Sequence, residues 1–201
     1  DAVCVLNGDA PFIDADTLRA SLELHTSSNS EVTVITADID DPQGYGRIIR
    51  SSGEFTAIRE QKDCSPAEAE ICEVNSGAYW FSAKALLQTL PKLSTNNAAG
   101  EYYLTDCVEM MSRRQAYKSA NPDIVLGANT RGALLELNQL ARLRKLSRLM
   151  DEGVSFITLD GIIIGTDVRI GCDTTILPNT VILGNTTIGK GCTIGANSHI
   201  E

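Results

Sequence analysis

A carboxylate stands directly behind a short apolar run near the start of the chain, in the stretch VLNGDAPF at residues 5–12. Asp9 follows Gly8, and Pro11 prevents further strand pairing because proline has no backbone N–H. Proteins usually hold magnesium through one or two carboxylates, with substrate phosphates and water completing the shell. Asp9 is therefore a candidate magnesium ligand. A carboxylate here could equally cap a turn or the next helix, and this stretch alone leaves both interpretations open.

Composition narrows the class of protein. The chain has 201 residues, of which 43% are hydrophobic and 21% charged, with a formal net charge of -9. This length supports one core, or one core plus a small module. An acidic chain repels phosphate backbones, so we expect no nucleic-acid partner. The apolar stretches are shorter than the ~20 residues of a membrane helix, so we expect no membrane partner either.

The number and spacing of cysteines and histidines indicate the redox environment of the protein. The six cysteines are scattered without a CxxC pair, and there are only two histidines. This number and spacing of cysteines and histidines favours neither a disulfide framework nor a zinc site. We expect reduced thiols in a cytoplasmic protein.

Strand and helix patterns alternate over residues 1–131, which predicts an α/β layer fold with its site at the carboxyl edge of the sheet. The apolar run 2–6 reads as a strand covered on both faces. Ser52-Gly53 predicts a hairpin turn. Further strands are expected at 31–39 and 73–81, and helices at 11–25, 82–90 and 102–115. Asp14 or Asp16 is the expected cap of the first helix.

Two further regions follow. Residues 132–152 carry leucines at helical spacing with basic residues between them, which predicts a linker helix. From Ile164 to Ile200 an isoleucine recurs every six residues, and small or β-branched residues follow four positions later. This period fits a triangular parallel β-helix with three hexads in each coil. Residues 153–201 are therefore expected to form its first coils.

Six ordered segments carry a resemblance that covers essentially the whole chain: LNGDAPF, DDPQGYGRIIR, AIREQKD, EVNSGAYWF, NNAAGEYYLTD and LGANTR. Together with the hexads they resemble the bacterial bifunctional N-acetylglucosamine-1-phosphate uridylyltransferase/glucosamine-1-phosphate acetyltransferases. The resemblance implies the C-terminal part of a Rossmann-like nucleotidyltransferase domain at 1–131. A linker helix and the start of a left-handed β-helix would follow it.

The resemblance also implies the site. Asp9 and Asn129 would hold Mg²⁺, and no residue of the protein would act as a nucleophile. The implied substrate-binding residues are Asn7, Gly8, Asp9, Gly46, Glu60, Asn75 and Asn129. Asn7 departs from the family, which often has tyrosine there, and the chain is shorter than expected before Asn129. Without the resemblance, Gly46 would be interpreted as a bulge, Glu60 as a solvated charge and Asn75 as a turn residue.

The implied activity is uridylyl transfer from UTP to N-acetylglucosamine 1-phosphate, giving UDP-N-acetylglucosamine. Acetyl-CoA would be used only by the full-length parent, and a homotrimer would form through the β-helix. The family's glycine-rich LAAGxGTRM loop and its later coils are missing, and His199 lies too early to be the catalytic histidine. We therefore expect a fragment that is inactive alone. Two alternatives stay open: another sugar-1-phosphate nucleotidyltransferase with a β-helix tail, or a non-catalytic sugar-nucleotide-sensing or assembly subunit.

Overall fold

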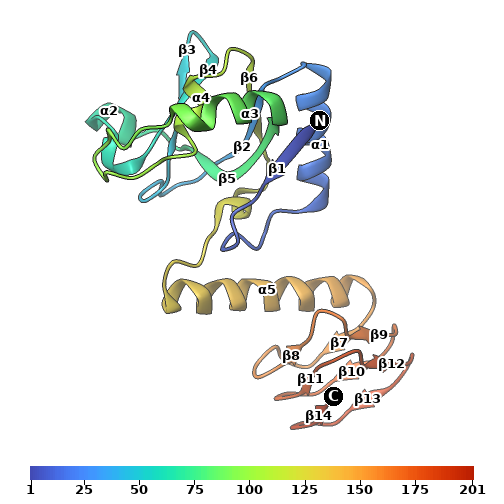
Figure 1. Cartoon of the computed structure of the whole chain (residues 1–201). Helices are drawn as coiled ribbons and strands as arrows, with labels where there is room; N and C mark the ends of the chain where they lie inside the picture. The colour runs from blue at the N-terminus through green and yellow to red at the C-terminus, as the bar shows by residue number, and fades with distance from the viewer. The chain divides into compact units, whose positions relative to one another are not determined.

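The computed structural model describes residues 1–201 and divides them into two compact units, Asp1–Ala128 and Asn129–Glu201 (Figure 1). The division lies three residues before the boundary expected from the sequence. None of the helices combines the length and the apolar character needed to cross a membrane.

The first unit is built on a six-stranded mixed sheet with the order β4-β3-β5-β2-β6, and β1 also pairs with β5. Only β2 and β6 are parallel neighbours. The strands are β1 (Ala2–Val5), β2 (Val32–Asp38), β3 (Arg47–Ser51), β4 (Glu54–Arg59), β5 (Glu73–Ser82) and β6 (Arg114–Lys118). The helices are α1 (Ala15–Ser27), α2 (Pro66–Ala69), α3 (Ala83–Thr89) and α4 (Asp106–Glu109), with short 3-10 turns at Gln61–Asp63, Leu90–Lys92 and Pro122–Val125.

Apolar side chains cover both faces of this sheet. On one face Tyr79 and Phe81 of β5 pack with Ile48 and Ile58 of the β3–β4 hairpin. On the other face Ile35, Ala37, Val74, Ala78, Ile124 and Val125 form a second buried cluster. The sheet is thus held between two cores, and its central strand β5 contributes to both.

The predicted helix cap and the predicted hairpin turn are both present in the structure. The Asp14 side chain accepts a hydrogen bond from the Thr17 N–H at 2.7 Å, so Asp14 is the cap of α1. Ser52 and Gly53 have φ angles of 51° and 86° and join β3 to β4. Two central residues with positive φ match the twist of the flanking strands. The predicted hairpin is confirmed.

Two expectations about this unit are wrong. The run 2–6 is not covered on both faces, because Val3 is 38% and Leu6 49% exposed. β1 also pairs with one strand only, β5. The helix expected at 102–115 shrinks to the four residues of α4. Arg114 donates to the carbonyl groups of Val108, Glu109 and Met111, which closes this turn. The chain then enters β6 beside β2, so sheet pairing outweighs helix propensity.

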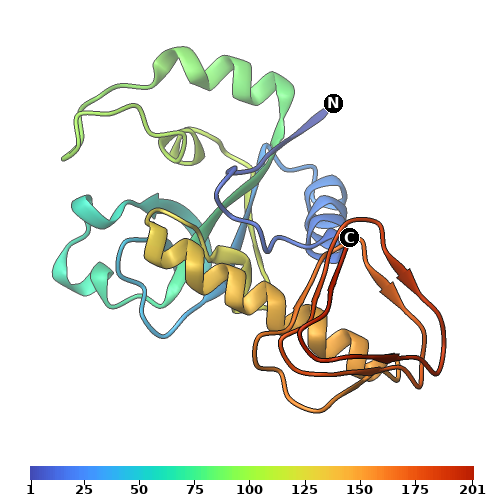
Figure 2. The same cartoon turned by 90° about the horizontal axis from the view of Figure 1, so that it is seen from below.

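The second unit begins with the helix α5 (Arg131–Asp151), whose N-cap is Thr130. Two-residue strands follow: β7 (Ser155–Phe156), β8 (Ile163–Ile164), β9 (Arg169–Ile170), β10 (Thr175–Ile176), β11 (Val181–Ile182), β12 (Thr187–Ile188), β13 (Thr193–Ile194) and β14 (His199–Ile200). Their parallel register pairs Ile164 with Ile182 and Ile176 with Ile194. The chain therefore returns after three hexads, and Figure 2 shows the triangular coil.

The coil interior is the predicted isoleucine stack. Ile176 and Ile182 have no exposed surface, and Leu146 and Leu149 of α5 close the same core. Thr174 and Thr180 occupy buried corners, where their hydroxyls bond to the Gly189 and Gly195 carbonyls of the next coil. Small hydroxyl residues thus satisfy backbone groups where the chain turns sharply.

Candidate functional site

A bulge in β5 sets the direction of Asn75. The pairing of β2 with β5 is interrupted between Val34, which faces Tyr79, and Thr36, which faces Asn75. Gly77 is the middle one of the three β5 residues within this interruption; it has a φ of +75°, and its N–H donates to Asn75 Oδ1 at 3.0 Å. A bulge redirects the side chain beside it. Asn75 is held half-buried in one orientation as a result.

Gly77 also brings the first loop of the chain to this point. A Cβ on Gly77 would lie 2.2 Å from Asn7 Nδ2, so only glycine leaves space for the Asn7 side chain here. Asn7 follows β1, whereas Gly77 lies in the middle of β5. The structure thereby brings Asn7 next to the turn that holds Asn75.

The hairpin supplies two more of the predicted residues. The Asn75 N–H donates to the Gly46 carbonyl at 2.8 Å. A Cβ on Gly46 would lie 2.9 Å from Ile58 Cγ2 and within 3.5 Å of both Glu60 carboxylate oxygens. The absence of a side chain at Gly46 therefore avoids a clash with Ile58, and Gly46 lies in contact range of the Glu60 carboxylate, which composition and spacing did not predict. Gly46, Glu60 and Asn75 form one group.

Two residues that the sequence did not single out support this group. Thr105 Oγ1 donates to Glu60 Oε1 at 2.8 Å, and the Tyr79 hydroxyl accepts from Asn75 Nδ2 at 2.6 Å. Burial raises the pKa of Tyr79, and the nearby Glu60 charge adds to this, so the phenol stays neutral. A hollow beside Glu60 is lined by Asp63, Asn96, Asn97, Tyr103 and Asp106, among others. Carboxylates, amides and hydroxyls of this kind suit the hydroxyl groups of a sugar.

Asp9 lies on an exposed turn. Its carbonyl accepts from the Ala128 N–H at 3.1 Å, and a Cβ on Gly127 would lie 3.7 Å from its Oδ2. The charges of Asp41 and Asp9 add to burial in raising the pKa of Tyr45, so Asp9 also lies near the loop before Gly46. Nothing would obstruct a Cβ on Gly8 within 4 Å, so the turn beside Asp9 is open.

The donors expected for the metal fit magnesium better than zinc. The structure contains no group of three His, Cys, Asp or Glu side chains that could hold an ion. One exposed carboxylate, with phosphates and water as the other ligands, is a typical magnesium arrangement. Asn129 is the first residue of the second unit and follows Ala128 directly. Its pairing with Asp9 at a metal stays a prediction, as do the binding roles of the other residues.

The role of Gly77 can be tested with a matched pair of substitutions. Gly77→Ala and Gly53→Ala both place alanine at a positive φ, of 75° and 86°, and should each destabilise the chain by about 1–2 kcal/mol. Only Gly77 has Asn7 within contact distance. The flexible Asn7 side chain should swing away in Gly77→Ala alone. NMR of the Asn7 side-chain amide in both variants measures this. An unmoved Asn7 resonance in Gly77→Ala would contradict the arrangement.

The family of the chain follows from comparison with known proteins. The family model described as nucleotidyl transferase matches residues 1–124, and the model described as bacterial transferase hexapeptide (six repeats) matches residues 167–201. The first match covers more than half of the chain, and the chain belongs to the nucleotidyl transferase family.

Its curated relatives include two-activity proteins. The bifunctional protein GlmU of Clostridium novyi is 44% identical over 172 residues, which cover 84% of this chain and 38% of the relative. GlmU of Enterococcus faecalis is 41% identical over 177 residues, covering 83% of this chain and 39% of the relative. The chain thus spans well under half the length of these relatives.

A solved structure shows the same fold at low identity. UDP-glucose phosphorylase from Trypanosoma brucei aligns with a TM-score of 0.52 and 13% identity, covering 99% of this chain and 56% of that one. The nucleotidyl transferase match and this likeness confirm the predicted fold class, an α/β nucleotidyltransferase domain followed by the start of a β-helix.

Proposed function

We propose that this chain carries the sugar-phosphate side of a uridylyltransferase site that makes UDP-N-acetylglucosamine. The observation that supports this most is the grouping of Gly46, Glu60 and Asn75, three residues that the family resemblance assigns to the sugar end of the ligand. An amide and a carboxylate offer both donors and acceptors to a sugar with an acetamido group. The 44% identity to a GlmU protein adds to this support.

The reaction needs positioning more than covalent help from the protein. A phosphate oxygen of N-acetylglucosamine 1-phosphate attacks the α-phosphorus of UTP, a new P–O bond forms, and the bond to pyrophosphate breaks. Glu60 and Asn75 orient the sugar, and Gly46, which has no side chain, lies beside Glu60. Asp9 and Asn129 would hold Mg²⁺, which neutralises charge on the phosphates when bound. Asn7 and Gly8 line the turn next to the nucleotide sugar.

The second unit adds a second activity and an oligomeric state to the proposal. Its coils belong to a hexapeptide-repeat β-helix, through which we expect three chains to associate. Acetyl transfer from acetyl-CoA to glucosamine 1-phosphate would then take place on the longer protein, in the cytoplasm.

A chimera tests the proposed function directly. Residues 1–201 would replace the matching segment of the Clostridium novyi relative, which supplies the remaining parts of both modules. We expect magnesium-dependent formation of UDP-N-acetylglucosamine, with N-acetylglucosamine 1-phosphate strongly preferred over glucose 1-phosphate. Preference for glucose 1-phosphate would identify a different sugar-1-phosphate nucleotidyltransferase. A folded chimera that transfers acetyl groups but no nucleotide would support the sensing or assembly role instead.

A further inference from the structure

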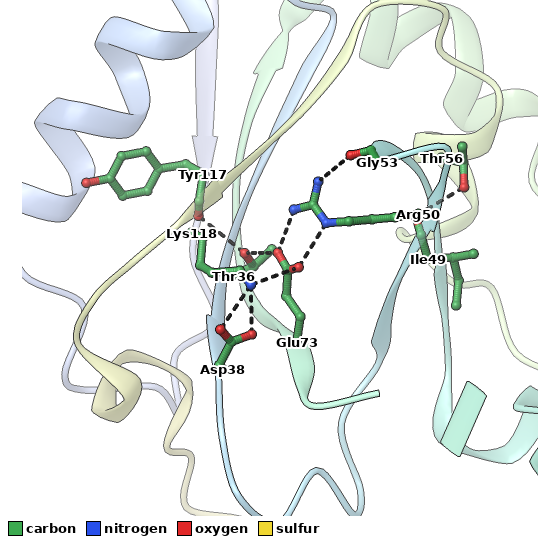
Figure 3. Close-up of polar contacts among 9 residues, drawn as sticks. All are labelled: Thr36, Asp38, Ile49, Arg50, Gly53, Thr56, Glu73, Tyr117 and Lys118. Carbon is green, nitrogen blue, oxygen red and sulfur yellow. Dashed lines mark hydrogen bonds and ion pairs between the residues drawn. The ribbon is translucent and has the colours of Figure 1, made fainter. Parts of the chain in front are cut away.

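The first residue of β5 is a buried carboxylate that the proposed reaction does not use. The Glu73 side chain is only 8% exposed. Arg50 of β3 donates to both of its oxygens, from Nε at 2.9 Å and from Nη2 at 2.7 Å. Thr36 of β2 donates its hydroxyl at 2.8 Å, and Lys118 Nζ of β6 lies 3.2 Å away. Four strands therefore meet at one carboxylate (Figure 3).

The charges in this cluster balance. Lys118 also pairs with both oxygens of Asp38 at 2.9 and 3.0 Å, so two cations face two carboxylates. Burial alone would raise the pKa of Glu73, but hydrogen bonds from Arg50 and Thr36 outweigh it and the net shift is downward. A buried carboxylate is stable only with such partners. Glu73 is therefore ionised, and on the side that faces β3 both of its carboxylate oxygens accept hydrogen bonds from Arg50.

The β3–β4 hairpin packs its apolar side chains on β5, but its backbone pairs with the rest of the sheet at few positions. β3 pairs with β5 at one position, Arg47 opposite Val74, beside the bond from the Asn75 N–H to the Gly46 carbonyl. Further along β3, the bidentate pair of Arg50 with Glu73 links the hairpin to β5. β4 is at the edge of the sheet. The two ends of the hairpin carry Gly46 and Glu60, so its position decides where these residues lie relative to Asn75.

We propose that Glu73 is a positioning residue: by holding Arg50, it fixes the hairpin so that Gly46 and Glu60 stay aligned with Asn75. Glu73 and Asn75 lie two residues apart on the same strand, so β5 carries both the site residue and the anchor for the hairpin. Thr36 and Lys118 hold the carboxylate from the opposite side. The proposal rests on the proposed function only for the identity of the ligand. The mechanical role of Glu73 follows from the contacts themselves.

Amide hydrogen exchange on the chain tests this role. Glu73→Gln keeps the shape of the side chain but removes its charge and should weaken the link by at least about tenfold in opening equilibrium. Exchange should then accelerate for hairpin residues 47–59 and for the Asn75 amide. Exchange in the β1–β5 and β2–β6 pairs should not change, because local openings need not involve the whole sheet. The Asn75 side-chain amide resonances should shift at the same time.

Two further variants keep the test decisive. Arg50→Gln removes the same link from the hairpin and leaves Glu73 with Thr36 and Lys118, so it should reproduce the hairpin-specific acceleration even if Glu73→Gln does not fold. Asp38→Asn removes the 58% exposed carboxylate of the same cluster without touching Arg50, and should leave hairpin exchange unchanged.

Each outcome supports or overturns the proposal. Acceleration confined to the hairpin and Asn75 in Glu73→Gln and Arg50→Gln supports it. Uniform acceleration over the whole sheet would make Glu73 a general core residue, and unchanged hairpin exchange would show that the backbone bonds suffice. Titration of the chain with UDP-N-acetylglucosamine is a separate measurement. Absence of binding would count against the proposed function, whereas the exchange pattern would still decide the role of Glu73.

Discussion

Uridylyl transfer should fall by roughly a hundredfold or more when Asp9 is replaced by asparagine in the chimera with the Clostridium novyi relative. The substitution keeps the size of the side chain and removes the negative charge proposed to hold magnesium. Acetyl transfer should stay nearly intact, because it takes place on the other module. Steady-state assays of both reactions on one preparation, over a range of magnesium concentrations, measure this.

A neighbouring carboxylate provides the matched control. Asp41 is exposed, and its charge, like that of Asp9, acts on Tyr45. Asp41→Asn removes the same charge from the same neighbourhood without removing a proposed ligand, and should change uridylyl transfer less than about threefold. Unchanged magnesium-dependent kinetics in Asp9→Asn would remove Asp9 from the site. Equal losses in both variants would point to a general electrostatic effect.

The second unit should lose its fold when Ile182 is replaced by aspartate. Ile182 has no exposed surface and lies in the core formed by the isoleucine stack and α5. An unpaired carboxylate in this apolar interior costs several kcal/mol. Each coil is stabilised by its contacts with the neighbouring coils, so the loss of one coil should destabilise the others in this short stack. Thermal unfolding followed by circular dichroism should show the loss of the transition that belongs to this unit.

Two aspartate substitutions next to Ile182 separate burial from charge. Leu183 is half-buried and Asn185 is exposed. Leu183→Asp should therefore be milder than Ile182→Asp, and the nearly isosteric Asn185→Asp should shift the midpoint very little. Equal shifts for all three variants would mean that the six-residue register does not describe the packing.

Local sequence patterns predicted the parts of this fold that are determined by interactions between residues close together in the chain. The isoleucine period indicated the β-helix because each hexad repeats the same packing problem, and Ser52-Gly53 indicated the hairpin because the turn requires a positive φ. Asp14 acts through a residue three positions away. In contrast, β6 has no distinctive pattern of its own. It is a strand because it pairs with β2, about eighty residues earlier in the chain, and no local propensity contains that information.

The residues of the candidate site also fall into those that the sequence indicated and those that it did not. The resemblance indicated Gly46, Glu60 and Asn75 because they lie in recognisable segments. The residues that hold them were missed: Thr105 on Glu60, Tyr79 on Asn75, and Gly77 beneath Asn7. Their partners are distant in sequence or depend on a bulge that interrupts the pairing of two strands. Of these three, only Gly77 carried a local signal, because a glycine within a strand, here in the VNSG segment, often marks a bulge.

The register of the β-helix converts chain length into distance. Ile176 lies beside Ile194 on the next coil, so three hexads advance the chain by one strand spacing of about 4.8 Å. Adding or removing one whole coil would move everything beyond it along the axis and leave each side chain on its original face. Adding or removing a single hexad would instead turn everything beyond it by about a third of a revolution, onto a different face of the prism. Insertions in this part of the chain should therefore be tolerated in steps of whole coils, and any groove built between neighbouring chains should depend on a count of hexads divisible by three.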